Sequence, residues 1–103
     1  MARKGTATKA AQEPEPRKKR LAMLHPECME DLRGWAEEDR RIAGRVLELM
    51  EECLREPFAG KGKPEPLKGP LSGAWSRRIT QEHRLVYTVH DDRVEFLQAR
   101  YHY

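Results

Sequence analysis

The 103-residue sequence has few of the residues that mark secreted, membrane-spanning or metal-binding proteins. It holds only two cysteines, Cys28 and Cys53, and no His/Cys pair has the spacing of zinc ligands. No apolar run approaches the ~18 residues of a membrane span. No apolar segment follows the basic N-terminus, as a secretory signal would require. We therefore expect one small cytoplasmic domain with reduced, partly buried thiols and no membrane association.

The small positive net charge of +3 hides an uneven distribution of charged residues along the chain. Residues 1–20 hold seven basic and two acidic residues, and residues 21–59 hold five basic and ten acidic. Residues 60–103 hold eight basic and five acidic residues, together with most of the aromatic ones. Positive charge among aromatic rings is typical of a surface that binds a polyanion, although an ordinary solvated surface can have the same composition.

The N-terminal residues 1–19 have no apolar periodicity and contain a Pro-Glu-Pro sequence. This composition predicts a disordered basic extension, either inert or weakly attracted to RNA or the ribosome. The structured domain is then expected over residues 20–103.

Two amphipathic helices are predicted after a short apolar strand at residues 20–25. The first helix, 27–38, would bury Met29, Leu32, Trp35 and Ala36. Asp39 is in position to cap the second helix, which Pro57 ends. The second helix carries an apolar stripe at helical spacing: Ile42, Val46, Leu49, Met50, Cys53 and Leu54.

A turn-rich link and three strands complete the domain. The link, 57–73, has four glycines and four prolines, but its apolar residues indicate a loop packed on the domain. Strands are predicted at 74–80, 83–89 and 93–103, joined by hairpin turns. The predicted fold is α+β with the order β-α-α-β-β-β. An antiparallel meander would be covered on one face by a two-helix hairpin, which leaves the other face free for function.

Basic residues from adjacent predicted strands could meet on that free face. Arg78 and Arg84 come from the first two strands of the meander, and Arg100 and His102 share a side if the last strand runs to the chain end. The preceding loop supplies Glu65, whose backbone is restricted by a proline on each side. The same loop also carries three lysines: Lys61, Lys63 and Lys68.

These residue types suit cleavage of RNA by its own 2′-OH, a reaction that needs no metal or cofactor. Glu65 could act as the general base, and His102 as the general acid, because an imidazole titrates near neutral pH. Arg78 and Arg84 could bind the phosphate. Tyr103 offers a ring and a phenol beside the acid, and Tyr101 could do the same or pack inward.

Other polar residues have simpler interpretations. Arg77 is interpreted as a solvated strand residue rather than a phosphate contact. His83 and His90 are expected to be surface or turn histidines, and His25 to be structural. Lys61 and Lys63 would make diffuse contacts to RNA or the ribosome. The expected core of the strands comprises Trp75, Ile79, Leu85, Tyr87, Val89 and Leu97.

Several long motifs resemble those of the YoeB/Txe toxins in the RelE superfamily of bacterial toxin–antitoxin systems. These motifs are GKGKPEPLKG, LSG-x-WSRRI, EHRLVY and the closing YHY. The resemblance runs without gaps from about Leu21 to Tyr103 and excludes the first twenty residues. Mild departures are Met29, where a large residue is common, and Ala74 before the tryptophan.

The resemblance implies the RelE-like microbial ribonuclease fold and an endoribonuclease that cuts mRNA in the ribosomal A site. It implies Glu65 as base, Arg78 and Arg84 as phosphate ligands, and His102 with Tyr103 as the C-terminal pair. Lys68 would contact RNA. A YefM-like antitoxin would mask the site, and a homodimer is compatible with the sequence.

Two alternative functions stay open at this point. A ParE-like gyrase inhibitor shares the fold, but that branch lacks the base–arginine–histidine set. A catalytically silent RNA- or ribosome-binding module would have the same charges without cutting.

Overall fold

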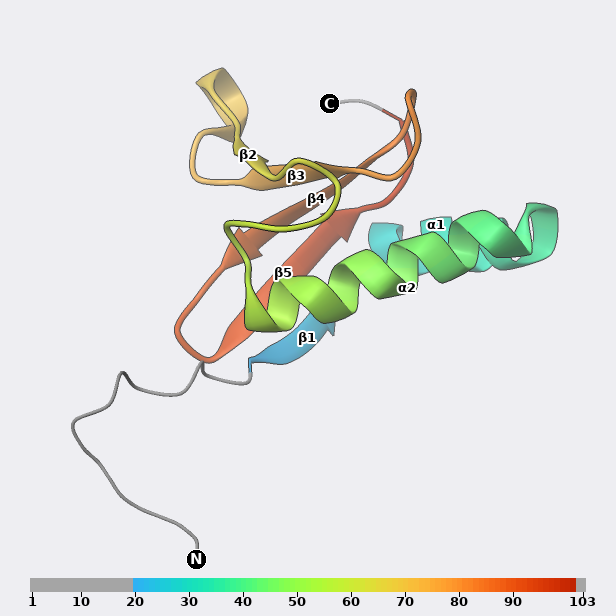
Figure 1. Ribbon diagram of the computed structural model, residues 1–103, viewed down its shortest axis with the longest axis horizontal. Coiled ribbons are helices and arrows are strands. Elements are labelled where there is room, and N and C mark those ends of the chain that lie inside the picture. Colours follow the sequence, from blue (N-terminus) through green and yellow to red (C-terminus); the bar gives the residue numbers. More distant parts are fainter. Residues whose placement is uncertain (1–19, 102–103) are drawn as a thin grey trace, which may run out of the picture.

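The computed structural model describes residues 20–101, so the predicted N-terminal extension and the C-terminal pair His102 and Tyr103 lie outside the described residues. The domain has α+β architecture with a five-stranded sheet in the order β1-β5-β4-β3-β2. Figure 1 shows the two helices together on one side of this sheet. The predicted fold class is confirmed.

The sheet combines an antiparallel meander with one parallel edge. Strands β3 (Trp75–Arg78), β4 (Arg84–Val89) and β5 (Arg93–Gln98) pair antiparallel in sequence order. Strand β1 (Leu21–Leu24) pairs parallel with β5, which its connection through the helices permits. The predicted meander is therefore correct, and the first strand forms an edge.

The sequence prediction missed the other edge strand. Glu65 and Pro66 form a two-residue strand, β2 (Glu65–Pro66), which pairs antiparallel with β3. A short 3-10 helix, η1 (Gly69–Leu71), follows in the same link. Leu67 is buried beside β3, so the prediction of a packed link rather than a free linker is confirmed.

The helical hairpin consists of α1 (Pro26–Glu38) and α2 (Arg40–Arg55). Asp39 separates them, and its carboxylate accepts hydrogen bonds from the amides of Arg41 and Ile42, as expected of an N-cap. The apolar stripe of α2 is confirmed, because its central residues are buried against the sheet. These are Val46, Leu49, Met50 and Cys53, and Ala43, which the prediction did not include, is buried with them.

The buried face of α1 differs from the predicted one by one position. Cys28 and Trp35 are buried, whereas Met29 is 55% exposed and Ala36 is exposed as well. The spacing of Cys28, Leu32 and Trp35 also fits one helical face, so the pattern alone allowed both choices. Both cysteines are free and buried, and burial raises the pKa of Cys28 to about 12 and of Cys53 to about 11.

A β-bulge in β5 changes which residues face the helices. Val86 of β4 pairs with Gln98 and Tyr87 pairs with Phe96, so Leu97 has no direct partner on β4. Phe96 and Ala99 both join the main core, while Leu97 packs on the opposite face with Leu67 and Val86. Within the described residues, the predicted strict alternation is therefore wrong after Leu97.

Candidate active site

The sheet face that the helices leave uncovered carries the predicted catalytic residues Glu65, Arg78 and Arg84. Glu65 pairs with Ser76, and Arg78 pairs with Arg84, in the registers of neighbouring strands. Cross-strand partners point to the same side of a sheet, and residues two apart on one strand do so too. The register therefore brings Glu65, Arg78 and Arg84 to one face, as the sequence predicts.

The two arginines lie directly opposite each other across β3 and β4. Like charges in that position repel, so the pairing is unfavourable unless an anion lies between or above them. The Arg78 side chain is exposed and has no hydrogen-bond or ion-pair partner among residues 20–101. This arrangement is suited to a phosphate, which a guanidinium can bind through two parallel hydrogen bonds.

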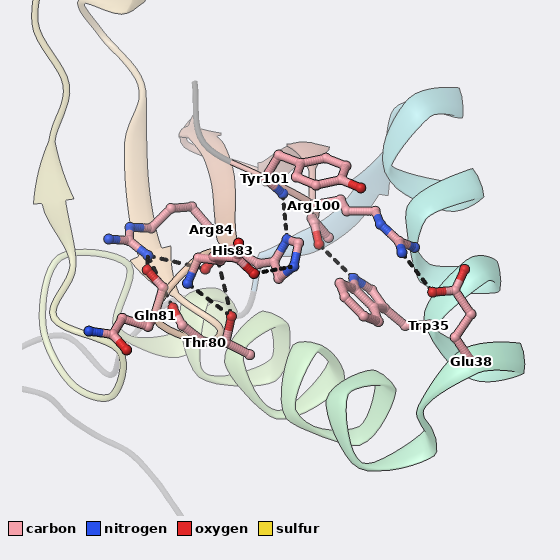
Figure 2. Close-up of polar contacts among 10 residues, drawn as sticks. Trp35, Glu38, Thr80, Gln81, His83, Arg84, Arg100 and Tyr101 are labelled. Atoms are coloured by element: carbon pink, nitrogen blue, oxygen red, sulfur yellow. Dashed lines mark hydrogen bonds and ion pairs between the residues drawn. The ribbon is translucent and has the colours of Figure 1, made fainter.

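The Arg84 guanidinium is held in place by the turn that precedes it. Its Nη1 donates to the carbonyl oxygens of Thr80 and Gln81, both at 3.1 Å, and of His83 at 3.3 Å (Figure 2). The Thr80 hydroxyl in turn accepts from the amides of Glu82 and His83, which fixes the turn. One nitrogen of the guanidinium thus orients Arg84.

Beneath this face, Arg77 anchors the loop that leads to Glu65. The side chain is fully buried, so the interpretation of Arg77 as a solvated residue is wrong. Its Nε donates to the Tyr87 hydroxyl at 3.2 Å, and its Nη1 donates to the Glu52 carboxylate at 3.3 Å. The remaining contacts are to loop carbonyls of Glu56, Ala59 and Lys61.

Predicted RNA-binding lysines project from this anchored loop. Lys61, Lys63 and Lys68 are exposed, and Lys63 has a positive φ of 51°. The loop approaches β3 closely, since the Arg78 amide donates to the Gly62 carbonyl at 2.6 Å. A Cβ on Gly62 would lie 3.1 Å from both the Arg77 Cβ and the Arg78 oxygen, so glycine fits where the loop meets the strand.

Arg100 lies away from the other predicted RNA contacts. Its guanidinium stacks on Trp35 at 4.1 Å and donates to Glu38 at 2.7 Å, and the Glu38 hydrogen bond raises the pKa of Arg100. The cause is the end of β5 at Gln98, which removes the alternation expected to carry Arg100 alongside His102. RNA binding by Arg100 stays a prediction, and the position of the Arg100 side chain does not support it.

Tyr101 brings the chain back to the start of β4. Its amide donates to His83 Nδ1 at 2.7 Å, and its carbonyl accepts from the Arg84 amide at 3.2 Å. His83 is only 8% exposed and packs between the rings of Trp35 and Tyr101. Of the predicted surface or turn position, the surface part is wrong, whereas His83 does end the turn between β3 and β4. No local pattern indicated it, because its partners are distant in the sequence.

Two other histidines, His25 and His90, lie at the far end of the same face. His25 Nε2 and His90 Nε2 lie 3.2 and 3.6 Å from the carboxylate of Glu95, consistent with a structural His25. Across residues 20–101, no three His, Cys, Asp or Glu side chains are grouped to hold a metal ion. Neither helix in this part of the chain is long and apolar enough to cross a bilayer.

Comparison with known proteins gives the family. Residues 24–103 match the family described as the YoeB-like toxin of bacterial type II toxin–antitoxin systems. The chain belongs to this family. A relative in Mycobacterium bovis, Toxin YoeB, is 56% identical over 84 residues, which are 82% of this chain and 99% of the relative. Toxin YoeB of Escherichia coli K12 is 56% identical over 77 residues, which are 75% of this chain and 92% of that protein.

Solved structures of YoeB toxins have the same fold. The YoeB dimer from Staphylococcus aureus superposes with a TM-score of 0.77 at 37% identity, covering 84% of this chain and 100% of that one. A YoeB–YefM complex from the same organism gives a TM-score of 0.74 at 36% identity, with the same coverage. The chain is thus a toxin of the YoeB/RelE type. Its strand register puts Glu65, Arg78 and Arg84 on one face of the sheet.

Proposed function

We propose that this toxin is an endoribonuclease that cleaves mRNA in the ribosomal A site and thereby stops translation. The observation that carries the proposal is the opposed pair Arg78 and Arg84 on the same open sheet face as Glu65. The two cations would stabilise charge that develops on the phosphoryl oxygens, and the carboxylate would supply a base.

In the proposed reaction, Glu65 takes the proton from the 2′-OH, and the 2′-oxygen forms a bond to phosphorus. The bond from phosphorus to the 5′-oxygen breaks, and His102 donates a proton to that leaving oxygen. The products are a 2′,3′-cyclic phosphate and a 5′-hydroxyl, with no redox change and no added reactant. Tyr103 would assist next to the acid, and Lys61, Lys63 and Lys68 would bind the RNA backbone.

The anchored position of Tyr101 supports a role for the two residues that follow it. Its carbonyl oxygen accepts a hydrogen bond from the backbone amide of Arg84. His102 is covalently joined to that carbonyl, so the chain leaves the described residues next to an arginine of the proposed site.

The proposed partners are a ribosome carrying A-site mRNA, a YefM-like antitoxin and a second copy of the toxin, all in the cytoplasm. The antitoxin and the dimer are proposed by analogy with the YoeB–YefM complex and the YoeB dimer of Staphylococcus aureus. Acidic antitoxin residues would compete with RNA phosphate for the arginines.

The test is a purified translation reaction in which mRNA 5′ ends are mapped after the toxin is added. We expect cuts within A-site codons that leave 5′-hydroxyl ends and disappear with Glu65→Ala and His102→Ala. Blocked translation without cuts, unchanged by those substitutions, would instead indicate a silent ribosome-binding module. Inhibited DNA supercoiling would indicate a gyrase inhibitor.

A further inference from the structure

The chain segment just before the C-terminal pair is held by side chains rather than by a continuous strand ladder. The Ala99 amide donates to the Asp31 carboxylate at 2.9 Å, and Trp35 Nε1 donates to the Ala99 carbonyl at 2.8 Å. The Tyr101 amide donates to His83 Nδ1 at 2.7 Å. Figure 2 shows Trp35 from α1 and His83 from the β3–β4 turn next to Arg100 and Tyr101.

Tyr101 adopts a backbone conformation that it would not choose alone. Its φ is +61°, in the left-handed region that a tyrosine seldom occupies. Such a conformation persists where the surrounding contacts impose it. The two contacts that Tyr101 makes through its backbone are to His83 Nδ1 and to the Arg84 amide, so His83 provides one of two points that fix it.

The contact to His83 depends on the protonation state of the imidazole. Nδ1 accepts a hydrogen bond only when it carries no proton, because a doubly protonated imidazolium has two donors and no acceptor. The ring also packs edge-on against Trp35, with centroids 4.8 Å apart, and at 5.0 Å from the Tyr101 ring. The ring packing and the hydrogen bond can therefore be removed separately by substitution.

We propose that His83 is a positioning residue, whose Nδ1 holds the Tyr101 amide and thereby fixes the Tyr101 backbone beside Arg84, at the proposed phosphate site. This inference rests on the proposed ribonuclease function, and it assigns His83 no contact with RNA. The charged groups around the ring are the Glu82 carboxylate, 3.8 Å from Nε2, and the guanidinium groups of Arg84 and Arg100 on either side of it (Figure 2).

Two substitutions separate the acceptor from the ring. His83→Phe keeps an aromatic ring without an acceptor, and His83→Asn restores an oxygen near the position of Nδ1 without the ring. Single-turnover cleavage on programmed ribosomes should fall about 10–100-fold in His83→Phe, because small displacements of catalytic groups have effects of that size. The half-saturating toxin concentration should stay the same. His83→Asn should regain most of the rate.

His90→Phe is the matched control, because His90 lies at the other end of the sheet, and it should cleave at the wild-type rate. His83→Phe cleaving within twofold of wild type would overturn the proposal. Equal losses in His83→Phe and His83→Asn would also overturn it, since the ring rather than the acceptor would then matter.

A second measurement does not depend on ribonuclease activity. In NMR spectra of the free toxin, the Tyr101 amide should be protected from hydrogen exchange in wild type and His83→Asn, and unprotected in His83→Phe. Unchanged protection in His83→Phe would show that His83 does not hold the segment, whatever the toxin does to RNA. If wild type did not cut mRNA but the pattern of amide protection were as expected, the proposed ribonuclease function would be rejected. The role of His83 in catalysis would be rejected with it, whereas the contact between His83 and Tyr101 would still be supported.

Discussion

The two ends of the uncovered sheet face are both charged, but only one end satisfies its charges internally. At the end near the β4–β5 turn, the Glu95 carboxylate lies 3.2 Å from His25, 3.6 Å from His90 and 2.9 Å from Arg93. At the other end, Arg78 and Arg84 lie opposite each other in the register of β3 and β4, and neither has an acidic partner among residues 20–101.

The carboxylates at the two ends differ in the same way. Glu95 has three cationic or imidazole partners, whereas the side chain of Glu65 has no hydrogen-bond or ion-pair partner among residues 20–101. A paired carboxylate contributes to the stability of the folded domain. A carboxylate without a partner, close to two arginines, is available to a ligand. The comparison teaches that surface charge alone does not mark the site. What distinguishes the proposed site is charge for which residues 20–101 provide no oppositely charged partner.

Removing the carboxylate at each end gives the largest expected difference. Glu65→Gln should slow mRNA cleavage about 10²–10⁴-fold, the range for loss of a general base. Its melting temperature should stay near that of wild type, because the Glu65 side chain makes no contact that the fold needs. Cleavage rate on programmed ribosomes and thermal unfolding are the two measurements.

Glu95→Gln is the matched control at the paired end. It should cleave normally and melt at a lower temperature. If Glu65→Gln cleaved normally while Glu95→Gln did not, the assignment of the two ends would be reversed.

The next largest effect concerns the support beneath the site. Arg77→Met should lower the free energy of unfolding by about 3–5 kcal/mol, the range for removal of one member of a buried charged pair. It leaves Glu52 and several loop carbonyls without their buried donor. Chemical denaturation of the purified protein measures this change.

Arg78→Met is the matched control for Arg77→Met, because it replaces an arginine next in the chain whose side chain lies on the open face. It should alter stability by less than about 0.5 kcal/mol, as surface substitutions usually do. Equal destabilisation by both substitutions would contradict the opposite roles of the two arginines.

The sequence was sufficient to predict the parts of the fold that depend on local patterns. The Asp39 cap, the α2 stripe and the meander each depend on residues close together in the chain, and all are confirmed. Strand parity also placed Arg77 on the side of Trp75 and Ile79. The interpretation of Arg77 as solvated went against that parity, because an arginine is seldom fully buried.

The parts that the sequence did not predict depend on contacts between distant residues. Strand β2 is two residues long and is defined by pairing with β3, and the bulge at Leu97 is visible only in the β4–β5 register. That bulge and the end of β5 turned Arg100 toward Glu38 and Trp35. His83 likewise meets Trp35 and Tyr101 only after folding.

At the paired end, stability should depend on pH. Hydrogen bonds from His25 and then Arg93 lower the pKa of Glu95 below its ordinary value. A carboxylate with a lowered folded-state pKa adds stability above its unfolded pKa and loses it as pH falls. Wild type should therefore be more stable than Glu95→Gln near pH 7, and the difference should shrink as pH drops below about 4. Denaturant midpoints across this pH range measure the difference, and a gap that widened at low pH would contradict it.

The smallest expected effect has opposite signs at the two ends. Arg78→Gln removes one of two opposed positive charges, so it should raise the free energy of unfolding by a few tenths of a kcal/mol, about 0.2–1 at most. Arg93→Gln removes one partner of Glu95 and an ion-pair partner of Asp92, so it should lower stability. Added salt screens exposed charges and should reduce the gain from Arg78→Gln. Urea unfolding of both variants at low and high salt makes the comparison. A destabilising Arg78→Gln would mean that the domain does neutralise this arginine, and the distinction between the two ends would fail.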